Sequence, residues 1–565
     1  MTAPSVLASA APRGSGRFRL GGWGVLTVGI AVLLAMPILV VLAHVFIPAG
    51  EIWAHLWQTV LSRYVTNTLG LIVGVGAGVT LIGVGTAWLV VMCRFPGRGV
   101  FRWALLLPLA VPTYVIAYAY TDLLQFAGPV QTMLREMFDW GRDDYWFPQI
   151  RSLGGAIALM SLVLYPYVYL LSRAAFIEQS VCVLEVGRTL GRGPTRLFLG
   201  VAVPLARPAI AGGVALALME TLNDFGAVQF FGVDTFTTGI YRTWFGLGEQ
   251  AAAAQLAACL LVFVFVLLML ERWSRRRARY FHTTGRYREL PQYELRGVRA
   301  LLACVACALP VVLGFVLPAG LLLEMHLREG DHLFGTRFMG FAWNSLTLAT
   351  VAAVVAVVLA VIVSYGVRLR QHLVTQLAAR VASLGYAVPG SVIAVGVLIP
   401  LGWIDSQVNL FAHERFGMTP GLILTGTMVA LVYAYVVRFL AVSFNTVEAS
   451  LGKITPNMDA VSRTLGVSAG TTLRRVHMPI MRGSLFAAGI LIFVDVMKEL
   501  PATVILRPFD FDTLAVRAYE LASDERLAQA STSALAIVAV GIIPVIVLSI
   551  AMSRSRPGSA GPPAP

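Results

Sequence analysis

The chain has 565 residues, of which 58% are hydrophobic and only 13% are charged, and its mean hydropathy is +0.77. Soluble globular domains carry about 25% charged residues, so this composition excludes a soluble enzyme or binding module and indicates an integral membrane protein. The formal net charge of +14 is explained by basic loops that face anionic lipid headgroups, which is a better explanation than nucleic-acid binding.

Twelve apolar runs of about 20 residues follow one another along the chain, and each is long enough to cross about 30 Å of hydrocarbon as a helix. The six runs of the first half are predicted at Gly22–Phe46, Leu69–Cys93, Trp103–Leu124, Leu153–Leu171, Ala209–Phe231 and Ala251–Leu270. The six runs of the second half are predicted at Leu301–Leu323, Leu346–Val367, Leu377–Trp403, Gly421–Val437, Leu485–Leu506 and Ser533–Ser553. The sequence therefore predicts an all-α, polytopic membrane protein.

The basic residues predict the orientation, because Lys and Arg accumulate in cytoplasmic loops. Most of the 43 Lys and Arg residues lie in loops on the side of the N-terminus, so both termini are predicted to be cytosolic. The predicted organisation is a cytosolic tail, a first six-helix domain, a basic cytosolic linker, a second six-helix domain and a disordered tail, at residues 1–21, 22–270, 271–299, 300–553 and 554–565.

The two halves are predicted to be repeats. Pro112 and Pro389 stand 277 positions apart in matching Ala-Val-Pro strings, and Gly191 and Gly466 stand 275 positions apart. Six helices are an even number, so both repeats enter the membrane from the same side and are related by an axis along the membrane normal. A substrate path is expected between the halves.

One loop pattern occurs once in each half. Arg-Thr-Leu-Gly ends at Gly191 and again at Gly466, and in each copy a Pro, Pro204 or Pro479, follows 13 positions later. A short helix stopped by Gly, in a polar and basic interruption of the apolar sequence, is expected in both places. Two equivalent helices on the cytosolic face would give a partner two rigid levers.

These loops resemble the EAA motif of ABC-importer permeases, in which the motif forms the coupling helices. The first loop matches at Glu185, Gly191 and Pro204, with Val-Gly in place of Ala-Ala. The second loop keeps Gly466 and Pro479 but has Ala-Val-Ser where Glu-Ala-Ala would stand, with Asp459 just before it. The resemblance implies the type I, MetI-like permease fold in a bacterial inner membrane. It also implies as partners two ATPase subunits, which bind ATP and Mg, and a periplasmic substrate-binding protein, with no cofactor in this chain.

A narrower resemblance, to fused twelve-helix permeases for ferric iron, covers nearly the whole chain. The strings that carry it begin at Asp224-Phe225-Gly226-Ala227 and at Lys498-Glu499-Leu500-Pro501. Related permeases for thiamine, phosphonates or sulfate-like anions share the EAA motif, so these cargoes stay as alternatives.

Five charged residues are expected in or at the ends of the fifth and eleventh runs: Glu220, Asp224, Asp495, Lys498 and Glu499. A charge in the membrane costs several kcal/mol unless it is paired or lines water, so these residues are candidates for a translocation path that favours a cationic cargo. The alternative is that Lys498 pairs with an acid and locks the eleventh helix.

Arg242 and Arg517 occupy equivalent positions in predicted outer loops, where each could receive an acid from one lobe of the binding protein. The alternative is an arginine that caps a helix or faces headgroups.

The sequence contains no GxxxxGK[ST] phosphate loop, so ATP hydrolysis is expected on a separate polypeptide and this chain is not expected to be an enzyme. No HExxH motif or Cys/His cluster indicates a metal site, and any metal-binding residues stay unknown. A gradient-driven secondary transporter accounts for twelve helices and intramembrane acids but not for the repeated loops. A membrane-embedded enzyme is a third option, for which no catalytic constellation is found.

Overall fold

The computed structural model describes residues 22–178, 193–276, 292–331, 335–369 and 372–554. Within these residues eleven helices are long and apolar enough to cross a membrane, and a bent pair brings the number to twelve if it is one span. The predicted all-α, polytopic class is confirmed.

The first half is made of helices of very different length. Its α-helices are α1 (Gly22–Ala43), α2 (Gly50–Thr59), α3 (Leu61–Met92), α4 (Arg98–Ala104), α5 (Thr113–Leu124), α6 (Pro129–Phe138), α7 (Leu153–Glu178), α9 (Pro194–Leu197), α10 (Val203–Asn223), α11 (Gly226–Phe230), α12 (Phe236–Tyr241) and α13 (Gln250–Arg276). Short 3-10 or π turns are η1 (His44–Phe46), η2 (Leu107–Ala110), η3 (Phe198–Ala202) and η4 (Arg242–Gly246).

The second half repeats this order. Its α-helices are α14 (Val298–Val311), α15 (Leu317–Arg328), α16 (Thr336–Leu369), α17 (Leu373–Ala382), α18 (Gly390–Phe416), α19 (Met428–Leu451), α20 (Pro456–Thr464), α21 (Ala469–Thr472), α22 (Met478–Met497), α23 (Pro501–Leu506), α24 (Leu514–Ser523) and α25 (Leu527–Arg554). The short turns are η5 (Val312–Val316), η6 (Ser383–Ala387) and η7 (Leu473–His477). Strands β1 (Cys93–Arg94) and β2 (Tyr293–Glu294) pair in parallel.

Two asparagines make the same contact in both halves. The Asn67 side chain donates to the Asp234 carbonyl at 2.8 Å, and the Asn344 side chain donates to the Asp512 carbonyl at 3.1 Å. Each bond ties a long apolar helix, α3 or α16, to the loop before α12 or α24. These equivalent contacts follow the repeat that the sequence predicts.

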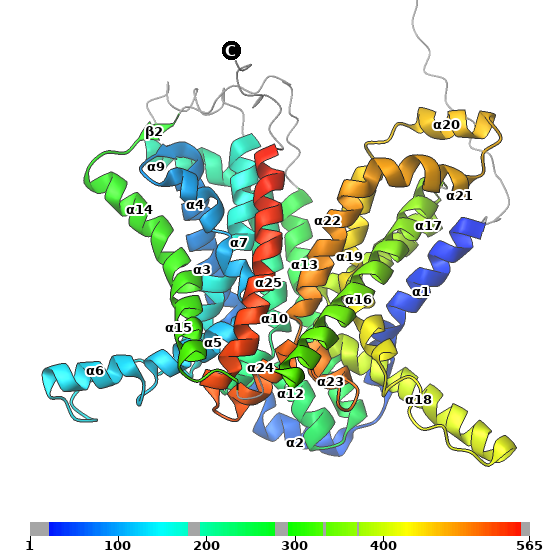
Figure 1. The fold of residues 1–565 in the computed structure, drawn as a ribbon, viewed down its shortest axis with the longest axis horizontal. Helices are drawn as coiled ribbons and strands as arrows, with labels where there is room; N and C mark the ends of the chain where they lie inside the picture. The colour runs from blue at the N-terminus through cyan, green and yellow to red at the C-terminus, as the bar shows by residue number, and fades with distance from the viewer. Residues whose placement is uncertain (1–21, 179–192, 277–291, 332–334, 370–371, 555–565) are drawn as a thin grey trace, which may run out of the picture.

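The first helix of each half packs against the other half. Helix α1 lies against α16, α17 and α18, and α14 and α15 lie against α3, α4 and α5 (Figure 1). Glycines permit the close approach: a Cβ on Gly396 would lie 2.2 Å from the Pro37 carbonyl oxygen, and one on Gly314 would lie 2.6 Å from the Leu162 carbonyl oxygen. Small residues at such crossings let helix backbones pack tightly in lipid.

Four predicted spans are broken in the structure. The third is broken between η2 and α5, where the two segments meet at 91°, because Pro112 directly precedes α5 and Val111 before it is extended, as a residue before proline usually is. The ninth, predicted at Leu377–Trp403, is divided among α17, η6 and α18, because Val388 is extended before Pro389.

The fifth and eleventh end at Asn223 and Met497 and are followed by the short helices α11 and α23. Apolar residues continue past both breaks, so hydropathy alone places the ends of these two spans too late in the sequence.

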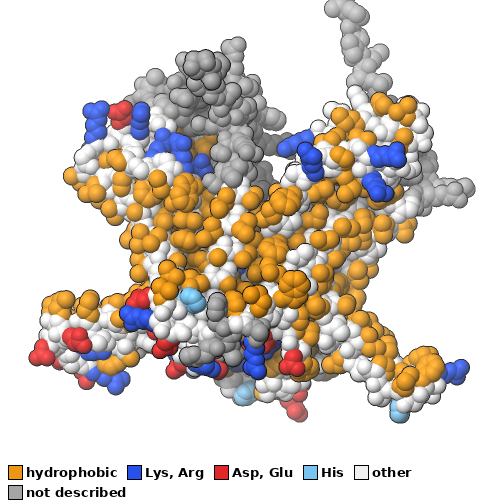
Figure 2. Space-filling view, in the orientation of Figure 1, with side chains coloured by type: hydrophobic (Ala, Val, Ile, Leu, Met, Phe, Trp, Pro, Cys, Tyr) orange, Lys and Arg blue, Asp and Glu red, His pale blue; other side chains and the backbone are white. Residues whose placement is uncertain are grey.

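Charged side chains separate along the long direction of the helices. Lys and Arg gather at the end where α4 and α20 lie, and most acidic side chains visible in this view lie at the opposite end, near α6 and α24 (Figure 2). An apolar belt lies between them. This is the distribution expected of a polytopic protein in a bilayer.

Candidate functional site

Equivalent carboxylates close the turns that follow α10 and α22. Asp224 Oδ1 accepts hydrogen bonds from the backbone amides of Ala227 and Val228 at 3.0 and 3.1 Å. The Glu499 carboxylate accepts from the amides of Ala502 and Thr503 at 2.9 and 3.1 Å. Each acid therefore satisfies amides at the start of a short helix, where a negative charge is favoured.

The two turns differ in the group that completes them. The Thr113 hydroxyl donates to Asp224 Oδ2 in the first half. The residue 277 positions later is Gly390, which has no side chain to offer. The Arg438 guanidinium takes this place beside Glu499: a Cβ on Gly390 would lie 2.7 Å from Glu499 Oε1 and 2.8 Å from Arg438 Nη1.

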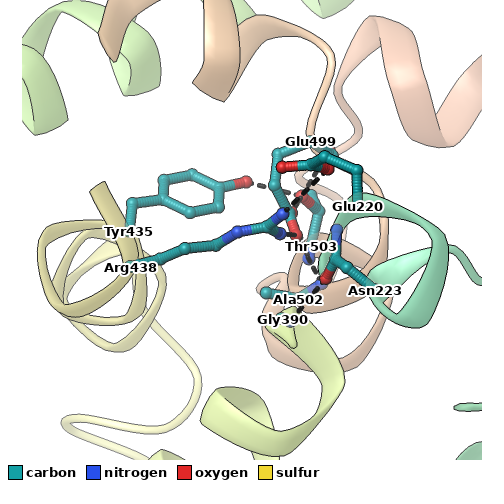
Figure 3. Close-up of polar contacts among 8 residues, drawn as sticks. All are labelled: Glu220, Asn223, Gly390, Tyr435, Arg438, Glu499, Ala502 and Thr503. Carbon is teal, nitrogen blue, oxygen red and sulfur yellow. Dashed lines mark hydrogen bonds and ion pairs between the residues drawn. The ribbon is translucent and has the colours of Figure 1, made fainter. Parts of the chain in front are cut away.

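Arg438 joins the two halves. Its Nη1 atom lies 2.8 Å from Glu499 Oε1, and its Nη2 atom lies 3.7 Å from Glu220 Oε2 on α10 of the first half. Only 6% of the Arg438 side chain and 2% of the Glu499 side chain are exposed. The guanidinium is thus a buried cation placed between two carboxylates from different halves (Figure 3).

A second contact between the halves lies beside this one. The Asn223 side-chain oxygen accepts a hydrogen bond from the Gly390 amide at 2.7 Å (Figure 3). Asn223 ends α10 and Gly390 begins α18, so the bond joins two helix ends across the interface. It satisfies a buried amide at a helix start, which is costly to leave unpaired.

These charged groups line a cavity of about 90 Å³ between the halves. All five residues predicted for a translocation path lie in its wall, together with Arg438. The cavity therefore has four carboxylates and two basic side chains, a formal excess of two negative charges. Within the described residues no group of three or more His, Cys, Asp or Glu side chains could hold a metal ion, so the wall provides charge without a tight chelating site.

Lys498 pairs within its own segment. Its Nζ atom lies 3.1 Å from Asp495 Oδ1, three residues earlier, and both side chains are about one quarter exposed. This contact agrees with the alternative interpretation of Lys498, because it fixes the end of α22. Lys498 and Asp495 also line the cavity, so Lys498 both fixes the end of α22 and forms part of the cavity wall.

The second of the two repeated loops has the predicted shape, a short helix that ends before a glycine. Helix α20 ends at Thr464, and Gly466 then adopts the left-handed conformation with φ of 71°, which favours glycine. Pro479 lies in the first turn of α22, and Pro204 lies in the first turn of α10. The first-loop residues Glu185 and Gly191 lie outside the described residues.

Asp459 fastens this loop to the transmembrane helices. Its Oδ2 atom accepts from the Arg368 guanidinium, with Nη2 at 2.7 Å and Nε at 2.9 Å, and its Oδ1 atom lies 3.0 Å from His477 Nε2. Arg368 lies in the last turn of α16, and His477 directly precedes α22. Asp459 is therefore the point where α20 meets both helices. Glu499, which lines the cavity, lies two residues beyond the opposite end of α22.

The two candidate docking arginines have different surroundings. Arg242 pairs with Asp234 at 2.5 Å, and 47% of its side chain is exposed. Arg517 pairs with Asp331 at 3.2 Å, with 14% of the arginine and none of the aspartate exposed. Of the two, Arg242 offers more surface to a partner.

Sequence reasoning missed Arg438. The tenth predicted span ends at Val437, which assigns the next residue to a cytosolic loop, whereas α19 continues to Leu451 and holds Arg438 near its middle. The assignment of Arg438 to a loop is therefore wrong. An available signal was the apolar segment Phe439-Leu440-Ala441-Val442, which follows Arg438 and continues the helix.

Comparisons with known proteins give one family match and several relatives. Residues 79–280 match the family described as "Binding-protein-dependent transport system inner membrane component". The chain is 26% identical over 92% of its length to the Fe(3+)-transport system permease protein FbpB 2 of Haemophilus influenzae, of which 97% is covered. It is 28% identical over 40% of its length to the molybdenum transport system permease protein ModB of Escherichia coli, of which 95% is covered. A similar match, 28% over 40% of the chain and 82% of the relative, is to the putative 2-aminoethylphosphonate transport system permease protein PhnU of Salmonella choleraesuis.

Proposed function

We propose that this chain is a binding-protein-dependent transport system inner membrane component, the fused permease of an ATP-driven importer for ferric iron. The observation that supports a cationic cargo is the cavity between the halves, whose carboxylates outnumber its basic groups by two. A low-dielectric passage with excess negative charge favours a cation and opposes an anion.

The relatives differ in the cargo that their names state. The relative matched along nearly the whole of both chains is named for Fe(3+), whereas the relatives named for molybdenum and 2-aminoethylphosphonate match only 40% of this chain. A phosphonate is an anion, and the formal charge of the cavity opposes it. The full-length match and the acidic wall therefore support the same class of cargo.

The energy source is proposed to be a pair of separate ATPase subunits, each of which binds ATP and Mg and receives one coupling loop. The contacts of Asp459 support this role, because an ion pair joins α20 to Arg368 of α16 and the same carboxylate lies beside His477, which directly precedes α22. A push on α20 would then reach the cavity through α22. ATP-driven dimerisation of the two subunits would shift the permease between outward and inward openings by binding one state better than the other.

The basic end of the molecule is proposed to face the cytosol, which puts both termini and α20 on the side of the ATPases. The charge separation in Figure 2 and the preference of Lys and Arg for cytoplasmic loops support this orientation. A periplasmic binding protein would then dock at the opposite end, near α6, α12 and α24. Arg242, in the turn that follows α12, is placed to meet it.

Purification of the tagged chain from its native membrane tests whether it is the permease of an ATP-driven importer. We expect an ATPase subunit to co-purify at two copies per permease, and uptake by the reconstituted complex to require ATP and to be blocked by vanadate. Uptake that collapses with an uncoupler, and that proceeds in liposomes holding this chain alone, would instead identify a gradient-driven transporter. Competition by thiamine or phosphonate for uptake would reassign the cargo but leave the machine unchanged.

A further inference from the structure

Arg438 has no equivalent in the first half. The local match of Tyr165-Pro-Tyr-Val with Tyr433-Ala-Tyr-Val places its counterpart at Leu170, which is uncharged. The offsets of 275 and 277 found on either side of this helix give Val163 and Ser161, which are uncharged too.

The carboxylate of the first turn accepts the neutral hydroxyl of Thr113, whereas that of the second turn accepts the hydroxyl of Thr503 and also faces a full positive charge. Glycine at position 390 leaves the space that the guanidinium fills. The difference between the two turns therefore depends on two positions, Arg438 and Gly390.

The guanidinium is not fully satisfied where it lies. Its Nε atom is buried, and it has no hydrogen-bond partner in the described structure. Its Nη2 atom lies 3.7 Å from Glu220, beyond the length of a good hydrogen bond. Arginine has five N–H donors, so this arrangement leaves donors unused that a better fixed structural arginine would employ.

We propose that Arg438 is a tethered cation that occupies the acidic wall of the cavity in the absence of cargo, and that a multivalent cation must displace its guanidinium from Glu499 and Glu220 to bind there. This inference rests on the proposed function and adds that the Arg438 guanidinium competes with the transported cation for the carboxylates of the cavity. Displacement breaks the charge contact between α19 and α10, so arrival of the cation also releases a contact that joins the two halves.

A tethered competitor explains how an acidic passage can release its cargo. The apparent affinity of a site falls in proportion to the fraction of time during which the site is open to ligand. A path must bind its ion weakly enough to let it leave. Arg438 supplies that weakening inside the cavity and returns to the carboxylates as the ion departs.

The test uses Tb³⁺ as a trivalent probe and the purified full chain in detergent, without ATPase or binding protein. Luminescence of bound Tb³⁺ can be excited through Tyr114 and Tyr167, which line the same cavity. Arg438→Gln is expected to bind Tb³⁺ about tenfold more tightly than the wild type, because the competitor and its charge are removed. Arg438→Gln combined with Glu499→Gln is expected to return the affinity toward the wild-type value.

A matched control is Arg415→Gln, which removes the same charge from an exposed position at the end of α18 and is expected to leave Tb³⁺ affinity unchanged. If Arg438→Gln does not fold, Arg438→Lys serves, because an ammonium group cannot contact both carboxylates as a guanidinium does; about threefold tighter binding is expected. Unchanged or weaker binding by a folded Arg438 variant would overturn the proposal. Since the assay contains no ATPase, its failure leaves ATP-driven import untouched, and failure of ATP-driven import leaves the Tb³⁺ result standing.

Discussion

Asp224 and Glu499 occupy equivalent positions in the two halves, and each accepts a threonine hydroxyl, but only Glu499 also accepts a buried guanidinium. Both carboxylates also accept two backbone amides at the start of a short helix. The duplicated scaffold therefore places matching acids on both sides of the cavity, and the partners of these acids make the two sides different. This difference leads to predictions for stability as well as for transport.

Glu499→Ala should destabilise the protein far more than Asp224→Ala. Removing Glu499 leaves the Arg438 charge buried without its close partner, and breaking a buried ion pair from one side costs about 3–5 kcal/mol. Asp224 has no cation within ion-pair distance in the described structure, so its loss should cost only about 1–3 kcal/mol for the hydrogen bonds it accepts. Thermal unfolding in detergent, followed by circular dichroism, measures the difference. Equal losses in the two variants would contradict the assigned pairing.

Gly390→Ala should disrupt the charged contact without changing any charge. The added Cβ would lie less than 3 Å from both Glu499 and Arg438, and overpacking of this kind costs about 1–3 kcal/mol. Gly489→Ala is the matched control, because its Cβ would meet its nearest neighbour, Val357, at an ordinary 4.0 Å. We expect a lower melting temperature and slower uptake for the first variant only. A wild-type melting curve for Gly390→Ala would show that the guanidinium does not occupy this space.

Asp459→Asn should separate ATP hydrolysis from transport. The substitution weakens the contacts of α20 with Arg368 and His477, so the ATPase would still turn over while its push reaches α22 poorly. We expect the number of ATP molecules hydrolysed per ion imported to rise several-fold in proteoliposomes. Lys453→Gln, an exposed charge in the same loop, serves as the control and should leave this ratio unchanged. Loss of both activities in proportion would mean that Asp459 contributes to assembly and not to coupling.

Arg242→Glu and Arg517→Glu should have different effects, although the two positions are equivalent in sequence. Arg242 is half exposed, so reversing its charge should weaken docking of the binding protein, while the loss of its pair with Asp234 should lower stability only slightly. Arg517 is largely buried against Asp331, so the same change should mainly lower the melting temperature. Binding of the periplasmic protein to the permease in nanodiscs, together with unfolding curves, separates the two effects. If Arg242→Glu binds the partner as the wild type does, Arg242 is not a docking residue.

Local sequence properties predicted most of the helices, the repeat and five of the six charged residues of the cavity, because each depends on hydropathy or on matching residues. The breaks after Asn223 and Met497 were not predictable in this way, since apolar residues continue past both and hydropathy does not detect a reversal of the chain. Arg438 was missed because a single charge ended the predicted span. Its contact with Glu220 depends on how α19 and α10 pack, which a single sequence does not report.

The central claim is that a cation passes between the two halves along the acids of the cavity. The most direct measurement is ATP-dependent uptake of radioactive ferric iron by proteoliposomes that contain the permease, its ATPase and its binding protein. The account predicts that Asp224→Asn combined with Glu499→Gln reduces the uptake rate at least about tenfold, whereas Glu136→Gln, on the exposed surface of α6, leaves it unchanged. Wild-type iron uptake by the folded double variant would contradict the account.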